Sequence, residues 1–233
     1  MFCVQCGATV EGAAGTCTAC GQVRQPALTT SDVSRAIRSA STDAWTALKQ
    51  VLRDPIGGLA SSFQALGEQR ARAAGIAFGA AFACLMVASF VLGARKLPMS
   101  LDLKILLSAF LTGVVPFATI ALSSAGARHV FNGSGTVGAD LFTAGVAVQP
   151  FGALFLLAAL LGGPNFVVVA ILTVFAATYS MCVLFVGCTR LAMVPERFAP
   201  PAVALMLLVA IWLSKIIIAS FFGWMNPLAS LFN

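Results

Sequence analysis

The sequence predicts an all-α polytopic membrane protein with about five transmembrane helices, and two observations lead to this fold class. The 233 residues are 59% hydrophobic and only 9% charged, whereas a soluble domain carries roughly 25% charged residues. Five stretches are apolar over about 20 residues, which is the length that crosses the hydrocarbon core of a bilayer. Most of the chain is therefore expected to face lipid or other helices rather than water.

The five predicted spans lie close together and form a predicted membrane domain of residues 73–223. They cover residues 73–94, 105–127, 141–162, 166–189 and 202–223. Trp224 follows the last span as a typical interfacial anchor, and residues 224–233 are expected to form a short outer tail. No internal repeat is apparent, so the sequence does not support an inverted-repeat transporter.

Basic residues predict the orientation. The first residues lack the basic region and apolar run of a cleavable signal peptide, so the N-terminus is expected to remain cytoplasmic. The cytoplasmic side then holds the basic residues before the first span, together with Arg128, Arg190 and Arg197. The other side holds Arg95, Lys96 and Lys104. We expect an integral protein of a bacterial inner membrane, with the C-terminus outside.

The N-terminal segment, residues 1–23, carries two copies of a metal-binding motif. They are Cys3-Val-Gln-Cys6-Gly7 and Cys17-Thr-Ala-Cys20-Gly21. Each CxxC spacing brings two sulfurs onto one metal ion, and the following glycine permits a backbone conformation that a Cβ would oppose. In a reducing compartment cysteines are thiols or metal ligands rather than disulfides. The sequence therefore predicts a zinc ribbon with one Zn2+ bound by four thiolates.

A structural role is the preferred interpretation of this zinc. Four cysteines close the coordination sphere, whereas a catalytic zinc keeps one position open. Redox sensing by the thiolates is the alternative. Nucleic-acid binding is disfavoured, because residues 1–23 contain no Lys or Arg to neutralise phosphates. The remaining cysteines, Cys84, Cys182 and Cys188, are interpreted as small apolar residues.

Residues 24–72 are predicted to form a linker and two amphipathic surface helices. The first helix has an apolar stripe of Val33, Ile37, Trp45, Leu48 and Leu52, and the second has Ile56, Leu59, Phe63 and Leu66. The second stretch ends in the polar residues 68–72, and both are too polar to span a bilayer. We expect them to lie on the cytoplasmic membrane surface, with Trp45 at the interface and Arg53 towards anionic headgroups.

The order of parts in residues 45–233 resembles the Yip family of five-span membrane proteins. The resemblance rests on the amphipathic lead-in, the segment Arg53-Asp54-Pro55-Ile56-Gly57-Gly58-Leu59, and five closely spaced spans after a cytoplasmic N-terminus. In eukaryotes that family is associated with vesicle traffic and small-GTPase partners. The zinc ribbon departs from the eukaryotic pattern, so the resemblance implies the fold more than the role.

A ridge of small residues in the first predicted span indicates close helix packing. Gly75, Gly79 and Ala83 lie on one face of the predicted helix and allow another backbone to approach. Packing within the monomer is the preferred interpretation, and dimerisation is the alternative.

Lys215 is the only charged residue well inside a predicted span, and no acidic residue lies deep enough in any span to pair with it. A lysine at a helix centre costs about 2.5–3.5 kcal/mol on insertion scales. Its side chain is expected to extend towards the nearer membrane surface. The alternative is an intramembrane polar site, for which Gln149 and Tyr179 are the candidate neighbours.

The residues favour a non-enzymatic function. The chain has one histidine and lacks a carboxylate pair, a phosphate-binding loop and a catalytic triad. We therefore expect a scaffold or adaptor that presents the zinc ribbon to a protein partner on the cytosolic side. The alternative is a small-solute or lipid transporter, or a channel subunit. Homo-oligomerisation stays open.

Overall fold

The computed structural model describes residues 30–94, 103–161 and 166–225. The chain separates into two compact units, Met1–Ser39 and Ala40–Asn233. In the first unit the described part is the beginning of one helix, residues 30–39. The second unit contains the remaining helices and all of the packing considered below.

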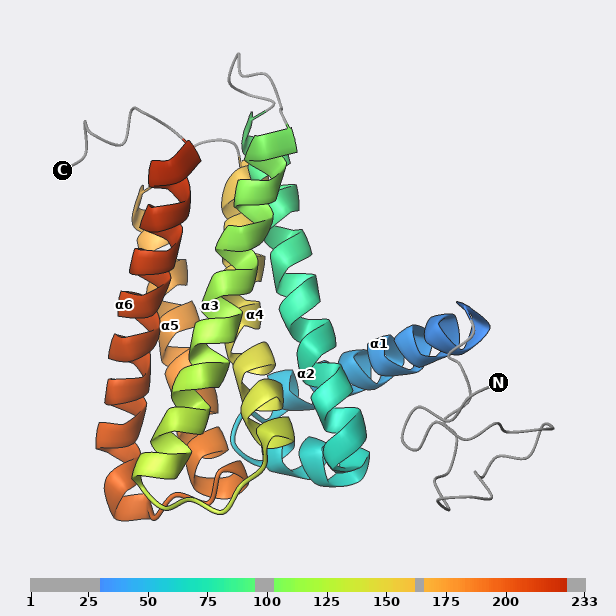
Figure 1. Ribbon diagram of the computed structural model, residues 1–233, viewed down its shortest axis with the longest axis vertical. Coiled ribbons are helices and arrows are strands. Elements are labelled where there is room, and N and C mark those ends of the chain that lie inside the picture. Colours follow the sequence, from blue (N-terminus) through green and yellow to red (C-terminus); the bar gives the residue numbers. More distant parts are fainter. Residues whose placement is uncertain (1–29, 95–102, 162–165, 226–233) are drawn as a thin grey trace, which may run out of the picture. The chain divides into compact units, whose positions relative to one another are not determined.

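All regular structure in the described ranges is helical (Figure 1). In chain order the elements are α1 (Thr30–Arg53), α2 (Gly57–Ala94), α3 (Leu103–Val130), α4 (Val137–Leu161), α5 (Phe166–Val186), the π-helical turn η1 (Gly187–Leu191), the 3₁₀ turn η2 (Glu196–Phe198) and α6 (Ala199–Met225). The prediction of an all-helical fold is confirmed for these residues.

Five of the helices are long and apolar enough to cross a membrane. They correspond to residues Gly57–Ala94, Ile105–Val130, Val137–Leu161, Val167–Leu191 and Glu196–Ser220. Helices α2 to α6 run alternately up and down, so the α3–α4 and η1–η2 connections lie at the same end (Figure 1). The chain thus has the helices of an integral membrane protein, as its composition predicts.

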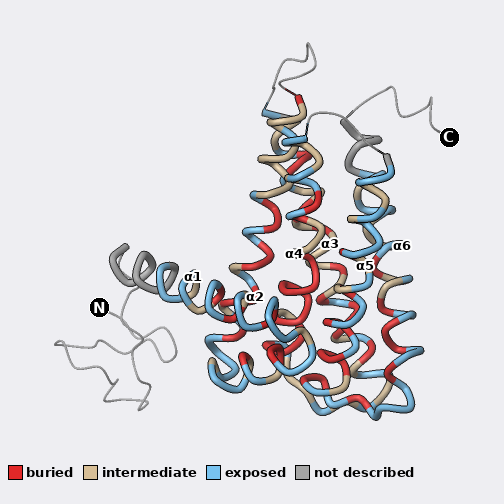
Figure 2. Tube along the Cα trace, turned by 180° about the vertical axis from the view of Figure 1, so that it is seen from behind, coloured by how far each residue is buried: buried red, intermediate tan, exposed pale blue. Residues whose placement is uncertain are grey.

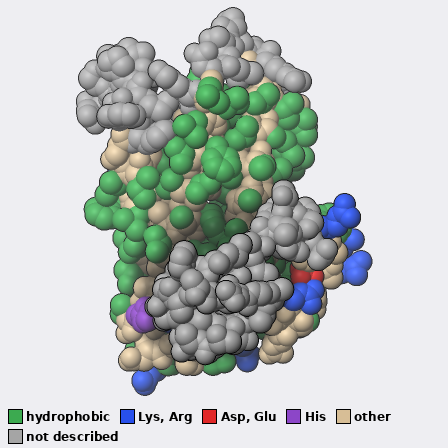
Figure 3. Space-filling view, turned by 45° about the vertical axis from the view of Figure 1, so that its right-hand side comes forward, with side chains coloured by type: hydrophobic (Ala, Val, Ile, Leu, Met, Phe, Trp, Pro, Cys, Tyr) green, Lys and Arg blue, Asp and Glu red, His purple; other side chains and the backbone are tan. Residues whose placement is uncertain are grey.

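We call the end formed by these two connections the basic end. It carries Arg128, Arg190 and Arg197, and His129 also lies there. In Figure 3 the His side chain and some Lys and Arg side chains lie near the bottom of the view, others lie at mid-height on the right, and the part above is mainly hydrophobic. This division matches the polarity expected where a bundle passes from headgroups into hydrocarbon.

The tightly packed part of the bundle lies towards the basic end (Figure 2). In α4, every residue from Gly138 to Val148 except Leu141 is buried, whereas Leu160 and Leu161 at its other end are exposed. Helix α5 shows the same gradient, because Val183 and Leu184 are buried and its first turns are exposed. The helices therefore share a common core near the basic end and present apolar side chains outward beyond it.

Helices α2 and α4 approach each other closely at Gly75. A Cβ at this position would lie 2.6 Å from the carbonyl carbon and oxygen of Leu141 and 2.7 Å from the nitrogen of Phe142. Only glycine permits two helix backbones to approach so closely. The close approach expected of the small-residue ridge is therefore made inside the chain. Gly79 lies against the ring of Phe117 in α3, and Ala83 lies against Gly113.

Among the boundaries that differ from the sequence-based expectation, two affect the residues of the site. The second amphipathic stretch does not end at residues 68–72, because it continues into the first span as α2 and bends at Gly67 (φ 71°, ψ 165°). Glycine adopts this positive φ without the cost that a Cβ imposes. The third span begins at Val137 rather than at residue 141, which places Asp140 inside it.

Candidate functional site: the hairpin docked near the basic end

The distinctive feature of the bundle is a helical hairpin packed into its side. It consists of the end of α1, a turn, and the first segment of α2, residues 40–66, and we call it the docked hairpin. Its two arms are held in antiparallel register by side chains. Gln50 donates to the hydroxyl of Ser61 at 2.8 Å and accepts from that of Ser62 at 3.0 Å. Further out, Arg70 Nε donates to Asp43 Oδ2 at 2.8 Å.

The turn of the hairpin is the segment Arg53–Leu59, and its residues have distinct roles. Asp54 Oδ1 accepts the backbone N–H groups of Ile56 at 3.2 Å and Gly57 at 2.9 Å, which is the N-cap arrangement of a helix. Pro55 follows Asp54 in the turn before α2, where its missing N–H is tolerated. A Cβ on Gly58 would lie 2.7 Å from the carbonyl oxygen of Gln50, so glycine lets α2 leave close against α1.

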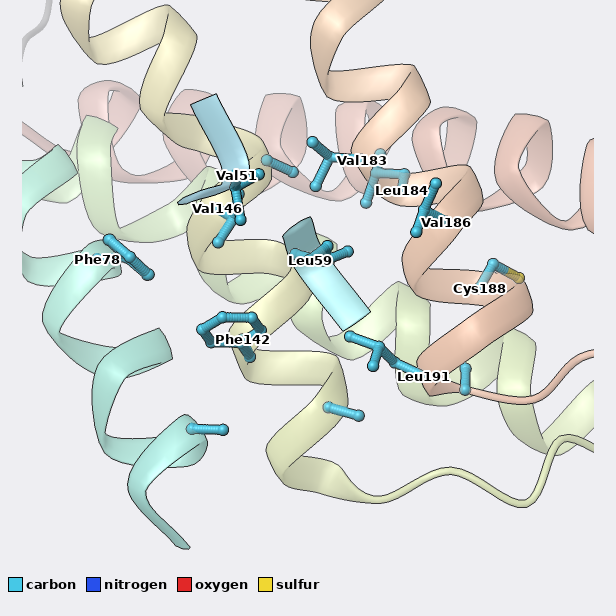
Figure 4. Close-up of a cluster of buried hydrophobic side chains, with 14 of the residues drawn as sticks. Val51, Leu59, Phe78, Phe142, Val146, Val183, Leu184, Val186, Cys188 and Leu191 are labelled. Carbon is cyan, nitrogen blue, oxygen red and sulfur yellow. The ribbon is translucent and has the colours of Figure 1, made fainter. Parts of the chain in front are cut away.

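The hairpin inserts its apolar side chains among the spanning helices. Val51 and Leu59 are fully buried. Figure 4 shows them between Phe78, Phe142 and Val146 on one side and Val183 and Leu184 on the other. The rings of Phe63 and Phe142 also meet, with centroids 6.0 Å apart. The hairpin is therefore part of the core and not a loosely attached lead-in.

Tyr179 of α5 fixes the hairpin through a backbone group. Its hydroxyl donates to the carbonyl oxygen of Val51 at 3.0 Å. In a continuing helix that carbonyl would accept the N–H of residue 55, but residue 55 is proline and has none. Val51 is fully buried, so an unpaired carbonyl there would be costly, and Tyr179 supplies the bond that the turn cannot make.

Of the three residues considered for an intramembrane polar site, two lie at the same cavity and the third lies elsewhere. Gln149 and Tyr179 line the same cavity between α1, α4 and α5. Gln149 Nε2 donates to the carbonyl oxygens of Phe78 at 2.8 Å and Gly145 at 3.2 Å. Lys215 is an exposed residue of α6 and does not line that cavity. The side chains of Gln149 and Tyr179 therefore donate hydrogen bonds to backbone carbonyls, whereas Lys215 lies outside this cavity.

An ion pair that the sequence reasoning missed joins α3 to α4. Asp140 is 2% exposed, accepts Arg128 Nε at 3.1 Å through Oδ2, and accepts the Ser124 hydroxyl at 2.7 Å through Oδ1. The predicted third span left Asp140 outside, whereas it lies in the first turn of α4, because α4 begins one turn earlier than predicted. The signal was present: Arg128 and Asp140 have opposite charges and flank one short connection.

The same end is closed by two connections that contact each other directly. Gly135 N–H donates to the carbonyl oxygen of Ala192 at 3.1 Å. The rings of Phe131 and Phe198 stack with centroids 5.8 Å apart, and Arg197 lies 4.5 Å from the centroid of Phe198. Hydrogen bonding and stacking thus join the α3–α4 connection to the segment after η1 and to η2 at the basic end.

Trp45 and Arg53 lie on the outer side of α1. Trp45 is 58% exposed, and Lys49 Nζ lies 5.0 Å from the centroid of its indole ring. The bundle covers Ala44, Ala47 and Val51 instead. The apolar stripe expected to be covered as a whole is therefore divided, with Trp45 and Leu52 left outside the protein core.

The four cysteines of the predicted zinc ribbon, Cys3, Cys6, Cys17 and Cys20, lie outside the described residues. Within the described ranges no group of three His, Cys, Asp or Glu side chains could hold a metal ion. Of the other cysteines, Cys84 and Cys182 are exposed and Cys188 is buried, all as free thiols.

Comparison of the chain with protein-family models, with curated proteins and with solved structures finds no match. The site therefore stands on its own geometry. The class of protein that this geometry defines is an integral membrane protein with a helical hairpin docked into its bundle.

Proposed function

We propose that this protein is a non-enzymatic membrane scaffold or adaptor, whose N-terminal zinc ribbon recruits a protein partner on the cytosolic side. The observation that carries the proposal is the docked hairpin. Helix α1 leads towards the N-terminal segment, and the C-terminal end of this helix is buried among the spanning helices. The chain towards the N-terminal segment is therefore anchored to the membrane domain through this helix.

The orientation and the location are part of the same proposal. Basic residues are retained on the cytoplasmic side of bacterial inner membranes, and the basic end carries Arg128, Arg190 and Arg197. The N-terminus then lies in the cytoplasm, where thiolates are kept reduced and can bind zinc. The resemblance of residues 45–233 to the Yip family is compatible with such a role and leaves the partner open.

Zinc content tests the module itself. We expect the purified full chain to contain about one zinc per molecule, because four thiolates complete one tetrahedral site. The double substitution Cys17→Ser/Cys20→Ser should remove it, whereas Cys84→Ser/Cys182→Ser should not. Elemental analysis of the three proteins gives the answer, and an equal zinc content in all of them would refute a four-cysteine site.

Partner recovery tests the adaptor function. We expect proteins to co-purify with the full chain from its native membrane and to be lost when residues 1–23 are removed. The Cys17→Ser/Cys20→Ser chain should lose the same proteins, because a module of this size depends on metal binding for its folding. If the truncated chain retains every partner, the N-terminal module is not the recruiting element.

A second candidate function is supported by the cavity that Gln149 and Tyr179 line. Its volume is about 390 Å³, and its walls are mainly apolar. Such a cavity would suit a small solute or a lipid moved by a transporter. Solute and lipid flux in proteoliposomes separates the two candidates: transport by the chain lacking residues 1–23 would favour the second.

A further inference from the structure

A cavity and a polar hollow lie on opposite flanks of the end of α1. The cavity, of about 390 Å³, is bounded by α1, α2, α4 and α5. Its lining includes Leu48, Leu52, Leu157, Leu172 and Phe175. The α1 wall consists of leucines, and the opposite walls come from helices long and apolar enough to span a membrane. The cavity therefore opens where hydrocarbon surrounds the bundle.

The hollow on the other flank, of about 420 Å³, is polar. It is lined by Lys49, Arg53, Gln50, Asp54 and Ser61 among others. The carboxylate of Asp54 is already engaged by the N–H groups at the start of α2. Lys49 and Arg53 form no ion pair among the described residues. The charge of this hollow that is free to meet a ligand is therefore positive.

The two spaces follow each other along the direction of the spans. The polar hollow reaches Gly58 and Ser61 in the first turns of α2, whereas the cavity reaches Leu85 of α2, well past the bend at Gly67. From the basic end towards the middle of the bundle, the basic side chains of the hollow come first, then α1, and then the apolar walls of the cavity. A phospholipid of the leaflet at the basic end has the same order of phosphate, glycerol and acyl chain.

The outer face of α1 connects the two spaces. Trp45, Lys49 and Leu52 are all exposed there, at helical positions that place them side by side. An indole at the level of the glycerol backbone is the usual anchor of a membrane interface. This face therefore carries a cation for the headgroup, an aromatic ring for the glycerol region and a leucine for the acyl chain of a lipid.

We propose that this place is a binding site for one anionic phospholipid. Its phosphate contacts Lys49 and Arg53, and one acyl chain enters the cavity beside Leu48 and Leu52. The proposal does not depend on the adaptor function, because every residue involved belongs to residues 45–179. The site recognises the headgroup by charge and the chain by the apolar walls, so a zwitterionic lipid should occupy it less well.

Trp45 reports on the site directly in the full-length protein. The variant Trp212→Phe/Trp224→Phe leaves Trp45 as the only tryptophan. It is reconstituted in vesicles into which phosphatidylglycerol or phosphatidylcholine with brominated acyl chains is titrated. Quenching of Trp45 should saturate and reach half its maximum at about thirty-fold lower mole fraction for the anionic lipid, the difference expected for contacts with two cations.

Four substitutions in that background complete the test. Lys49→Gln should reduce the preference for phosphatidylglycerol to about five-fold, because Arg53 remains, and Lys49→Arg should keep it unchanged. Ala153→Phe fills the cavity from an exposed position on α4 and should weaken the saturable quenching. Ala81→Phe is the matched control, since Ala81 is an exposed alanine of α2 that does not line the cavity.

Three outcomes would overturn the proposal. Equal quenching by the two lipids, or an unchanged preference in Lys49→Gln, would leave only non-selective contact with the bilayer. Identical effects of Ala153→Phe and Ala81→Phe would show that no acyl chain occupies the cavity. Absence of quenching by either lipid would mean that protein, and not lipid, covers this face of α1.

Discussion

Replacing Asp140 by alanine is expected to lower the free energy of unfolding by about 3–5 kcal/mol, the cost of breaking a buried ion pair from one side. The substitution leaves Arg128, whose side chain is 12% exposed, without its carboxylate partner. It also removes the acceptor of the Ser124 hydroxyl. Asp140→Ala should therefore weaken the packing of α3 against α4 at the basic end more than a substitution on the protein surface does.

Unfolding in detergent micelles, followed by circular dichroism, measures this effect. Glu196→Ala is the matched control, because Glu196 is an exposed acidic residue at the same end and such changes usually stay within about 0.5 kcal/mol. The double variant Arg128→Ala/Asp140→Ala should recover part of the loss, since no buried charge is then left unpaired. An Asp140→Ala chain as stable as Glu196→Ala would contradict the role assigned to the pair.

Adding a single methyl group at Gly75 is the second change with a large expected effect. In Gly75→Ala the new Cβ would lie 2.6 Å from the backbone of Leu141, so α2 and α4 would have to move apart. Overpacking of this kind costs about 1–3 kcal/mol, and Gly75→Leu should cost more. The same unfolding assay measures both variants.

Gly93 provides the control for this prediction, because it lies in the same helix and a Cβ there would meet nothing within 4 Å. Gly93→Ala should leave the free energy of unfolding unchanged or raise it by up to about 1 kcal/mol through its better helix propensity. If Gly75→Ala behaves like Gly93→Ala, the close contact between α2 and α4 does not exist in the protein.

The helical fold could be predicted from the sequence because its signals are local. Apolar stretches of sufficient length are visible in composition alone, and five such helices are found. The ends of the helices were harder to predict. The polar residues 68–72 resemble a boundary, yet Arg70 is paired with Asp43 and the helix continues through them.

Contacts between distant segments could not be predicted in the same way. The bond from Tyr179 to the carbonyl of Val51 joins residues 128 positions apart. Nothing local to either residue indicates it, although the missing N–H of Pro55 shows that a carbonyl near the end of α1 needs another donor. The periodicity of residues 32–53 indicated an apolar stripe but did not reveal that Ala44, Ala47 and Val51 face the bundle while Trp45 does not.

The orientation of the bundle is the claim on which the adaptor depends, and reporter fusions test it most directly. Alkaline phosphatase, which is active only outside the cytoplasm, is fused after His129 at the end of α3 or after Asn233, and both chains are produced in a bacterial host. With the basic end in the cytoplasm, the His129 fusion should be inactive and the Asn233 fusion active. An active His129 fusion together with an inactive Asn233 fusion would place the basic end outside and contradict the account.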